Sequence, residues 1–135
     1  MSTDWSQHPK IRLLARRLRR GGVIAYPTEA VWGLGCSPFD ELAVQRLLAL
    51  KGRDPAKGLI LVAADMAQLA PFLATVTDAQ RQQLQASWPG PVTWLVPEPG
   101  GVPEWIRGRF DSVALRVSDH PLVHGLCRAF GGPLI

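Results

Sequence analysis

KGRDPAKGLILVA, residues 51–63, is the stretch that decides the fold class of this chain. Its second part, residues 59–63, has the length and the branched apolar composition of a strand that is buried on both faces, as in sheets covered by helices. Its first part carries Lys51, Arg53 and Lys57 among glycine and proline, which prevent a helix from continuing. The stretch therefore predicts the end of a helix, a basic loop and a buried strand.

Helical and strand patterns alternate on both sides of this stretch. Apolar spacing predicts helices over about 11–20, 40–50, 65–73, 77–88 and 121–130, and strands over about 23–26, 92–96 and 112–117. Asp40 and Thr77 are suited to cap their helices, and Gly21 to end the first one. The Pro-rich stretch 97–101 indicates that some strands pair antiparallel. We expect one α/β domain with a mixed sheet and flanking helices, spanning residues 1–135.

Composition narrows the class of protein. The chain has 135 residues, 47% of them hydrophobic, which is enough for one globular core. Its apolar runs are too short to cross a membrane, and its first twenty residues contain six Lys or Arg instead of the apolar middle of a secretory signal, so we expect a cytoplasmic protein. Cys36 and Cys127 fit neither a disulfide framework nor a zinc motif, and we predict that both are small buried apolar residues.

The charge balance indicates an anionic partner. Fifteen Lys and Arg against eleven Asp and Glu give a net charge of +4, and twelve of the fifteen cations are arginine. Because the guanidinium group recognises phosphate in a planar, bidentate way, a nucleotide or a nucleic acid is favoured over an acidic protein surface.

Two segments could hold a ligand. In the basic loop 51–58, the three cations could converge on a polyphosphate or a carboxylate, or they could merely cap the preceding helix. The segment YPTEAVWGLG, residues 26–35, leaves a predicted strand, so its backbone N–H groups and the hydroxyl of Thr28 could face a ligand. Its alternative is an ordinary turn, with glycines that relieve strain and an inward-packed Trp32.

Three further clusters have a simpler structural interpretation. The arginines of residues 12–20 could grip a phosphate backbone, but such runs are more often the solvated face of an amphipathic helix. His120 and His124 are four residues apart without the glutamate of a zinc protease motif, which favours a helix cap or a surface role. Arg107 and Arg109 flank Gly108 on a predicted loop, either as anion contacts or as solvated side chains.

Several motifs, in order, resemble one family. YPTEAVWGLG, LLALKGRDPAKGLILV, WPGPVTWLV, FDSVALRVSDHPLV and the final GGPLI are similar to the YrdC family, the threonylcarbamoyl-AMP synthases. The resemblance implies a twisted α/β sheet with a basic concave face. It also implies a reaction of L-threonine, bicarbonate and ATP that yields threonylcarbamoyl-adenylate and pyrophosphate. This product is the donor for threonylcarbamoyladenosine in tRNA, so tRNA and the proteins that transfer the group to it are implied as downstream partners.

The resemblance also implies which residues form the active site. Lys51 and Arg53 occupy the K-x-R signature and would be the catalytic residues. With Lys57 they would hold the phosphates of ATP or the carboxylate derived from threonine. The residues implied in substrate binding are Thr28 of the PTE loop, Lys57, Thr93 of the Gly-Pro-x-Thr segment and Arg116 of the ALRV strand. ATP would be a substrate that brings Mg²⁺ with it, without a dedicated protein metal site.

The family pattern continues where the chain stops. In the family, the strand that begins at residues 133–135 leads directly into an S-x-N signature that closes over the nucleotide. Either the domain is truncated at its C-terminus or this sequence is part of a longer chain. In a truncated domain we expect turnover to be lower by on the order of a hundredfold or more, because fewer groups position the substrates. The alternative function is a non-catalytic module that binds duplex RNA or tRNA through the basic surface.

Overall fold

The computed structural model describes residues 5–27, 32–90 and 92–135. In chain order its elements are the 3₁₀ turn η1 (Trp5–Gln7), α1 (Pro9–Arg19), β1 (Ile24–Pro27), β2 (Trp32–Gly35), α2 (Glu41–Lys51), the 3₁₀ turn η2 (Pro55–Lys57), β3 (Ile60–Ala63), the 3₁₀ helix η3 (Met66–Leu73), α3 (Asp78–Ser87), β4 (Trp94–Pro97), α4 (Glu104–Arg107), β5 (Ser112–Val117) and α5 (Pro121–Phe130).

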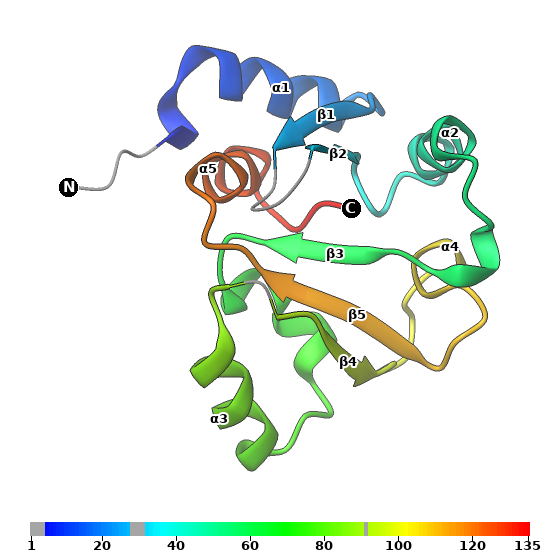
Figure 1. The fold of residues 1–135 in the computed structure, drawn as a ribbon, viewed down its shortest axis with the longest axis vertical. Coiled ribbons are helices and arrows are strands. Elements are labelled where there is room, and N and C mark those ends of the chain that lie inside the picture. Colours follow the sequence, from blue (N-terminus) through cyan, green and yellow to red (C-terminus); the bar gives the residue numbers. More distant parts are fainter. Residues whose placement is uncertain (1–4, 28–31, 91) are drawn as a thin grey trace.

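The described strands form two sheets (Figure 1). In the larger sheet β5 lies between β3 and β4; it is parallel to β3, with Ile60 opposite Ala114, and antiparallel to β4, with Leu95 opposite the same Ala114. The predicted α/β fold with mixed strand directions is confirmed. Two separate sheets were not predicted, because the pairing of the first hairpin was not recognised in the sequence.

β1 and β2 form that hairpin, with Ile24 opposite Gly35. The interpretation of residues 26–35 as a turn is wrong for residues 32–35, which are strand. Gly35 does not supply a positive φ. Instead it allows close packing, since a Cβ there would lie 2.3 Å from the ring of Tyr26. Thr28 and the side chain of Trp32 lie outside what the structure describes.

Most helix ends follow the predicted caps. The Asp40 carboxylate accepts from the N–H of Ala43, and Thr77 and Gln80 form a reciprocal capping box. Three details differ. Residues 66–73 form a 3₁₀ helix with Pro71 inside it, since proline lacks the N–H that an α-helix uses. The short helix α4 was not predicted, and β4 begins at Trp94 instead of Val92.

The core lies on both sides of β3. Leu61 and Ala63 belong to the apolar cluster shared with α2, η3 and β5, whereas Val62 faces the cluster shared with α1, β1 and α5. The prediction of a strand buried on both faces is therefore confirmed for residues 61–63 and wrong for Ile60, which is 47% exposed. Ile60 stands where the sheet opens toward the candidate site.

The last two residues connect the two sheets. Leu134 exchanges two hydrogen bonds of 2.8 Å with Val62 of β3, and the N–H of Ile135 donates to the carbonyl of Cys36, just after β2. The hydroxyl of Tyr26 donates to the carbonyl of Ile135 at 2.8 Å. The expectation that residues 134–135 have the character of a strand is confirmed for Leu134, which forms an isolated antiparallel bridge with Val62.

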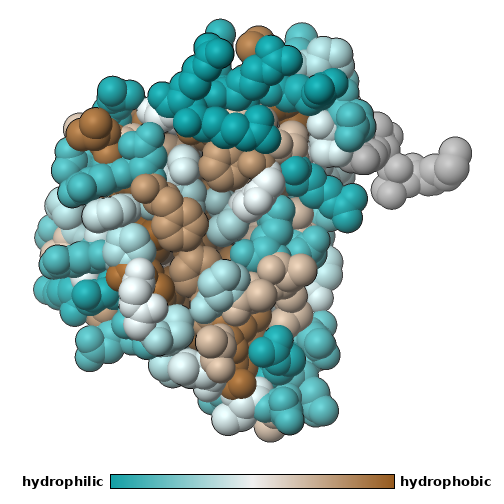
Figure 2. Space-filling view, turned by 180° about the vertical axis from the view of Figure 1, so that it is seen from behind, coloured by the Kyte–Doolittle hydropathy of each residue, from teal (hydrophilic) through white to brown (hydrophobic). Residues whose placement is uncertain are grey.

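α1 is an amphipathic helix with its arginines on the solvent side. Ile11, Ala15 and Leu18 are buried, while Arg12, Arg16, Arg17, Arg19 and Arg20 are exposed. In Figure 2 the hydrophilic side chains at the top of the view belong to this helix region, and an apolar region lies below them on the rear face. Arg19 donates to the carbonyls of Ala129 and Phe130 at the end of α5, so one arginine of the run serves as a helix cap. Within the described ranges, no helix has the length and hydropathy needed to span a bilayer.

Both cysteines are free and fully buried, as predicted. Burial raises the pKa of Cys36 and of Cys127 to about 12, so neither forms the reactive thiolate near neutral pH. We therefore expect no reaction with dithiodipyridine at pH 7.5 while the chain is folded, and two equivalents of released thiopyridone in denaturant. The absorbance of released thiopyridone measures both. Rapid labelling of the folded protein would contradict the burial.

Candidate functional site

A hollow of about 300 Å³, here called the cationic hollow, lies where the hairpin β1–β2, the end of α2 and the strands β3 and β5 meet. Three cations line it: Lys51 at the end of α2, Arg53 in the loop that follows, and Arg116 of β5. Its other lining residues include Tyr26, Gly33, Ile60 and Ser118. No Asp or Glu side chain is among the described residues that line it. Three positive charges in one concave site create a potential that attracts anions.

The basic loop is held rigidly at the mouth of this hollow. Lys51 ends α2, and Gly52 reverses the chain with φ +61°. Nε and Nη2 of Arg53 both donate to the carbonyl of Gly58, at 3.2 and 3.0 Å. Because two bonds fix the plane of the guanidinium, little rotamer entropy remains to be lost when an anion binds.

The turn that contains α4 clamps the same loop from outside. The N–H of Leu59 donates to the carbonyl of Ile106 at 2.8 Å, and the N–H of Arg109 donates to that of Ala56 at 3.0 Å. The Asp54 carboxylate caps η2 through the N–H of Ala56. The basic loop is therefore more than a helix cap: it is a fixed element between α2 and β3.

Arg116 approaches from the middle of the sheet. Its Nε donates to the carbonyl of Gly90 at 3.0 Å, which ties β5 to the segment before β4. Because Trp94 pairs with Leu115 in an antiparallel register, the exposed Thr93 lies next to Arg116 along the same ladder, just outside β4. The structure thus brings Thr93 and Arg116 together.

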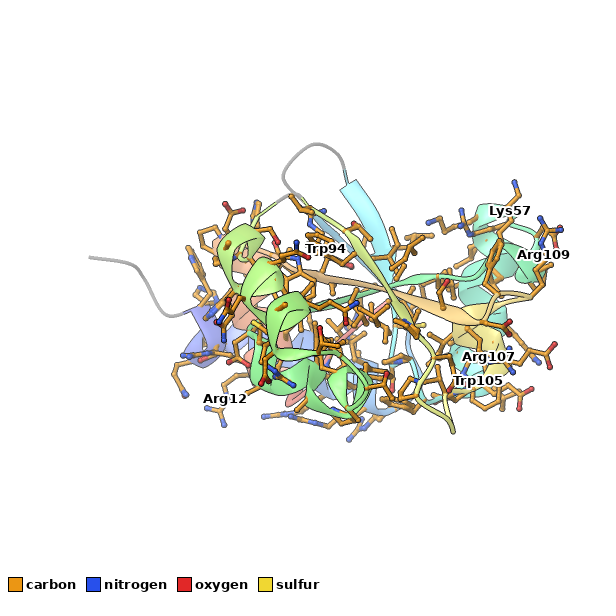
Figure 3. The ribbon with its side chains drawn as sticks, turned by 90° about the horizontal axis from the view of Figure 1, so that it is seen from below. Arg12, Lys57, Trp94, Trp105, Arg107 and Arg109 are labelled. Carbon is orange, nitrogen blue, oxygen red and sulfur yellow. The ribbon has the colours of Figure 1, made fainter. Side chains whose placement is uncertain are left out.

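Lys57 is placed differently from the other two cations of its loop. It lines a smaller hollow of about 140 Å³, together with Arg53 and Arg107, and it is not among the described residues that line the cationic hollow. In Figure 3 the side chains of Lys57 and Arg109 point outward, on the side of the molecule opposite Arg12. The predicted convergence of three cations on one point therefore holds for Lys51 and Arg53 but not for Lys57. Of these three described cations, Arg53 is the one that lines both hollows.

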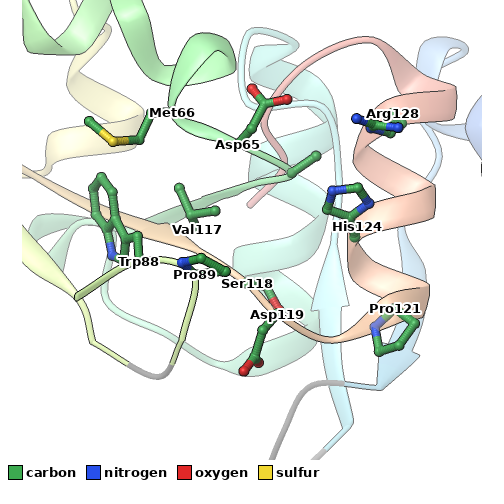
Figure 4. A pocket seen from close by; sticks show the side chains of 11 residues that line it. Asp65, Met66, Trp88, Pro89, Val117, Ser118, Asp119, Pro121, His124 and Arg128 are labelled. Carbon is green, nitrogen blue, oxygen red and sulfur yellow. The ribbon is translucent and has the colours of Figure 1, made fainter. Parts of the chain in front are cut away.

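A further hollow of about 470 Å³ lies at the carboxyl ends of β3 and β5 (Figure 4). Asp65, His124 and Arg128 stand along one side of it, and Trp88 on the other. Asp65 caps η3 through the N–H of Gln68, and His120 caps α5 through the N–H of Leu122, which confirms a capping role for that histidine. Across the described ranges, no three His, Cys, Asp or Glu side chains form a group suited to a metal ion.

Two polar residues of the cationic hollow escaped the sequence interpretation. Tyr26 lines the hollow, and its hydroxyl donates a hydrogen bond to the carbonyl of Ile135 there. Ser118 follows β5 and lines both the cationic hollow and the hollow of about 470 Å³ beside it. Ser118 had an available signal, because polar residues at the carboxyl end of a parallel strand often face a ligand. Tyr26 had none beyond its place in a strand.

Comparison with known proteins adds family evidence to this geometry. The model of the Sua5/YciO/YrdC family, described as "Telomere recombination", matches residues 16–135. A threonylcarbamoyl-AMP synthase of Cellvibrio japonicus is 62% identical over 132 residues, which are 98% of this chain and 70% of that protein. One from Chromohalobacter salexigens is 64% identical over 118 residues, which are 87% of this chain and 64% of that protein.

A solved structure gives the same relation in three dimensions. The crystal structure of P. abyssi Sua5 complexed with L-threonine superposes with a TM-score of 0.85 at 35% identity, over 93% of this chain and 37% of that one. Compared with the two synthases from Cellvibrio japonicus and Chromohalobacter salexigens, this chain spans about two thirds of their length.

Proposed function

The chain belongs to the Sua5/YciO/YrdC family, and from this premise we propose that it is a threonylcarbamoyl-AMP synthase. The reaction joins L-threonine, bicarbonate and ATP into threonylcarbamoyl-adenylate, with release of pyrophosphate and water. The observation that carries the proposal is the cationic hollow, in which Lys51, Arg53 and Arg116 surround a space suited to a small anionic substrate.

Charge neutralisation is the main task in this chemistry. The amine of threonine attacks the carbon of bicarbonate, a C–O bond breaks and the oxygen leaves as water, which gives a carbamate. A carbamate oxygen then attacks the α-phosphorus of ATP as pyrophosphate leaves. Every species except the amine is an anion, so the reactants repel each other unless cations hold them together. Lys51 and Arg53 are assigned to the transferring phosphate, because they lie at the mouth of the hollow on a fixed loop.

The remaining assignments divide the substrates between the two hollows. Arg116 binds the carboxylate of threonine inside the cationic hollow, and Thr93 positions substrate at its edge. Thr28 contacts the threonine. Lys57 binds the outer phosphates of ATP, since it shares the smaller hollow with Arg53. Mg²⁺ arrives bound to the phosphates of ATP, and it would supply part of the charge neutralisation.

The product serves tRNA modification. Threonylcarbamoyl-adenylate is the activated donor for adenosine in tRNA, so proteins that transfer the group to tRNA are the downstream partners. We place the reaction in the cytoplasm, where ATP and tRNA occur together.

Pyrophosphate release tests the activity. We expect it to depend on threonine and bicarbonate together, with isotope from labelled bicarbonate entering the adenylate. The control omits threonine. Pyrophosphate formed equally fast without threonine, or none above the buffer rate, would contradict the proposed function.

A further inference from the structure

The hollow of about 470 Å³ at the carboxyl ends of β3 and β5, here called the mixed-charge hollow, differs from the cationic hollow in its charges. Arg128 of α5 lines it together with two carboxylates, those of Asp65 and Asp119. A hollow of this composition does not attract a polyanion such as ATP or pyrophosphate, because the carboxylates repel it. A ligand that carries both signs of charge fits it instead.

The ionic groups of the mixed-charge hollow are available to a ligand. His124 and Arg128 are one turn apart on α5 and both line the hollow, and within the described part of the chain neither side chain has a hydrogen bond or an ion pair. Oδ1 of Asp65 accepts from the N–H of Gln68, whereas Oδ2 has no such partner among the described residues. A positive and a negative group are therefore both left for a ligand.

The opposite wall of the mixed-charge hollow is apolar. In Figure 4, Met66 and Trp88 lie across the hollow from Asp65, His124 and Arg128. The indole N–H of Trp88 already donates a hydrogen bond of 2.8 Å to a backbone carbonyl, so its ring offers the hollow an apolar surface. The hollow thus combines one wall with both signs of charge and one wall without charge.

We propose that the mixed-charge hollow binds a free α-amino acid with an apolar side chain, at a place separate from the substrates. The α-carboxylate pairs with Arg128, the α-ammonium group pairs with Asp65, and the side chain packs against Trp88. The volume of the hollow is typical of small-molecule sites. Because Ser118 lines both this hollow and the cationic hollow, the bound amino acid adjoins the substrates without using their cations. The inference does not depend on the proposed function.

Titration calorimetry with L-leucine tests the site. We expect saturable binding of one leucine per chain. Leucinol lacks the carboxylate and 4-methylpentanoate lacks the ammonium group, so each should bind about tenfold more weakly than leucine. An equal concentration of L-threonine should not displace leucine, since its short hydroxylated side chain leaves the surface of Trp88 uncovered.

Two single replacements locate the bound leucine. Arg128→Gln removes the positive charge from an exposed position on α5, and Asp65→Asn removes the negative charge but keeps an oxygen that can cap η3. Each should weaken leucine binding about tenfold. Binding of inorganic tripolyphosphate, a probe of the cationic hollow, should remain within roughly twofold. Arg12→Gln, at an exposed arginine of α1 that does not line the mixed-charge hollow, is the matched control and should change neither.

Four outcomes overturn the proposal. They are the absence of binding heat at about 10 mM leucine, equal binding of leucine and its two analogues, and an unchanged leucine affinity in Arg128→Gln and Asp65→Asn. The fourth is displacement of leucine by an equal concentration of threonine, because leucine would then occupy the substrate site. Weaker leucine binding in both variants, with tripolyphosphate affinity preserved, supports it.

Discussion

Replacement of Arg53 by alanine is expected to lower the rate of pyrophosphate release on the order of a hundredfold or more, while the chain stays folded. The guanidinium is the one cation that lines both hollows among the described residues, so its loss separates the phosphate-binding surface from the reacting centre. The binding of ATP should weaken together with the rate. Steady-state kinetics and calorimetry with ATP measure the two effects.

The same replacement has a small cost in stability. Arg53 makes two hydrogen bonds to the carbonyl of Gly58, but water can reach that partly exposed site and replace the lost donors. We expect a loss of about 1 kcal/mol, or roughly 4 °C in Tm. Arg53→Lys keeps the positive charge but loses the paired N–H groups that bond to the carbonyl of Gly58. Its rate of pyrophosphate release should therefore lie between the rates of the unaltered chain and of Arg53→Ala.

Arg12→Ala provides the matched control. It removes the same single positive charge, from the opposite side of the molecule (Figure 3), and Arg12 is exposed on α1. Its kinetics should equal those of the unaltered chain. Equal losses in Arg12→Ala and Arg53→Ala would mean that overall charge, and not the local site, determines the rate.

The elements that the sequence predicts well are those with local signals. Asp40 and Thr77 cap their helices because the cap is built within one turn of chain. The apolar run at residues 61–63 is buried because its composition demands it. The hairpin partner β2 was missed, since its WGLG sequence resembles a loop and its strand character depends on pairing with β1.

In the candidate site, too, the placements that depend on adjacent residues could be predicted, and those that depend on distant elements could not. The placement of Lys51 and Arg53 at one hollow follows from three residues of adjacent chain and a glycine turn. The separation of Lys57 from Lys51 does not, because it depends on α4, a helix 47 residues further along the chain that packs against η2. Tertiary clamps of this kind leave no local pattern in the loop they hold.

That clamp can be tested at Gly108. The residue has φ +66°, and a Cβ there would lie 2.4 Å from the N of Gly58 and 2.5 Å from the carbonyl oxygen of Ala56. Both are backbone atoms of the basic loop, so no side chain can move aside to make room. Gly108→Ala is therefore expected to destabilise the fold by about 3 kcal/mol, from the backbone strain together with the displaced contact.

The functional effect should follow from the displaced loop. If α4 holds Arg53 and Lys57 in place, Gly108→Ala will weaken tripolyphosphate binding several-fold at a temperature where the variant is still folded. Gly132→Ala is the matched control, because a Cβ there meets nothing within 4 Å and its φ is not in the strained range. Thermal melts and calorimetry on both variants decide the matter. Tripolyphosphate affinity preserved in a destabilised Gly108→Ala would show that the loop keeps its shape without the clamp.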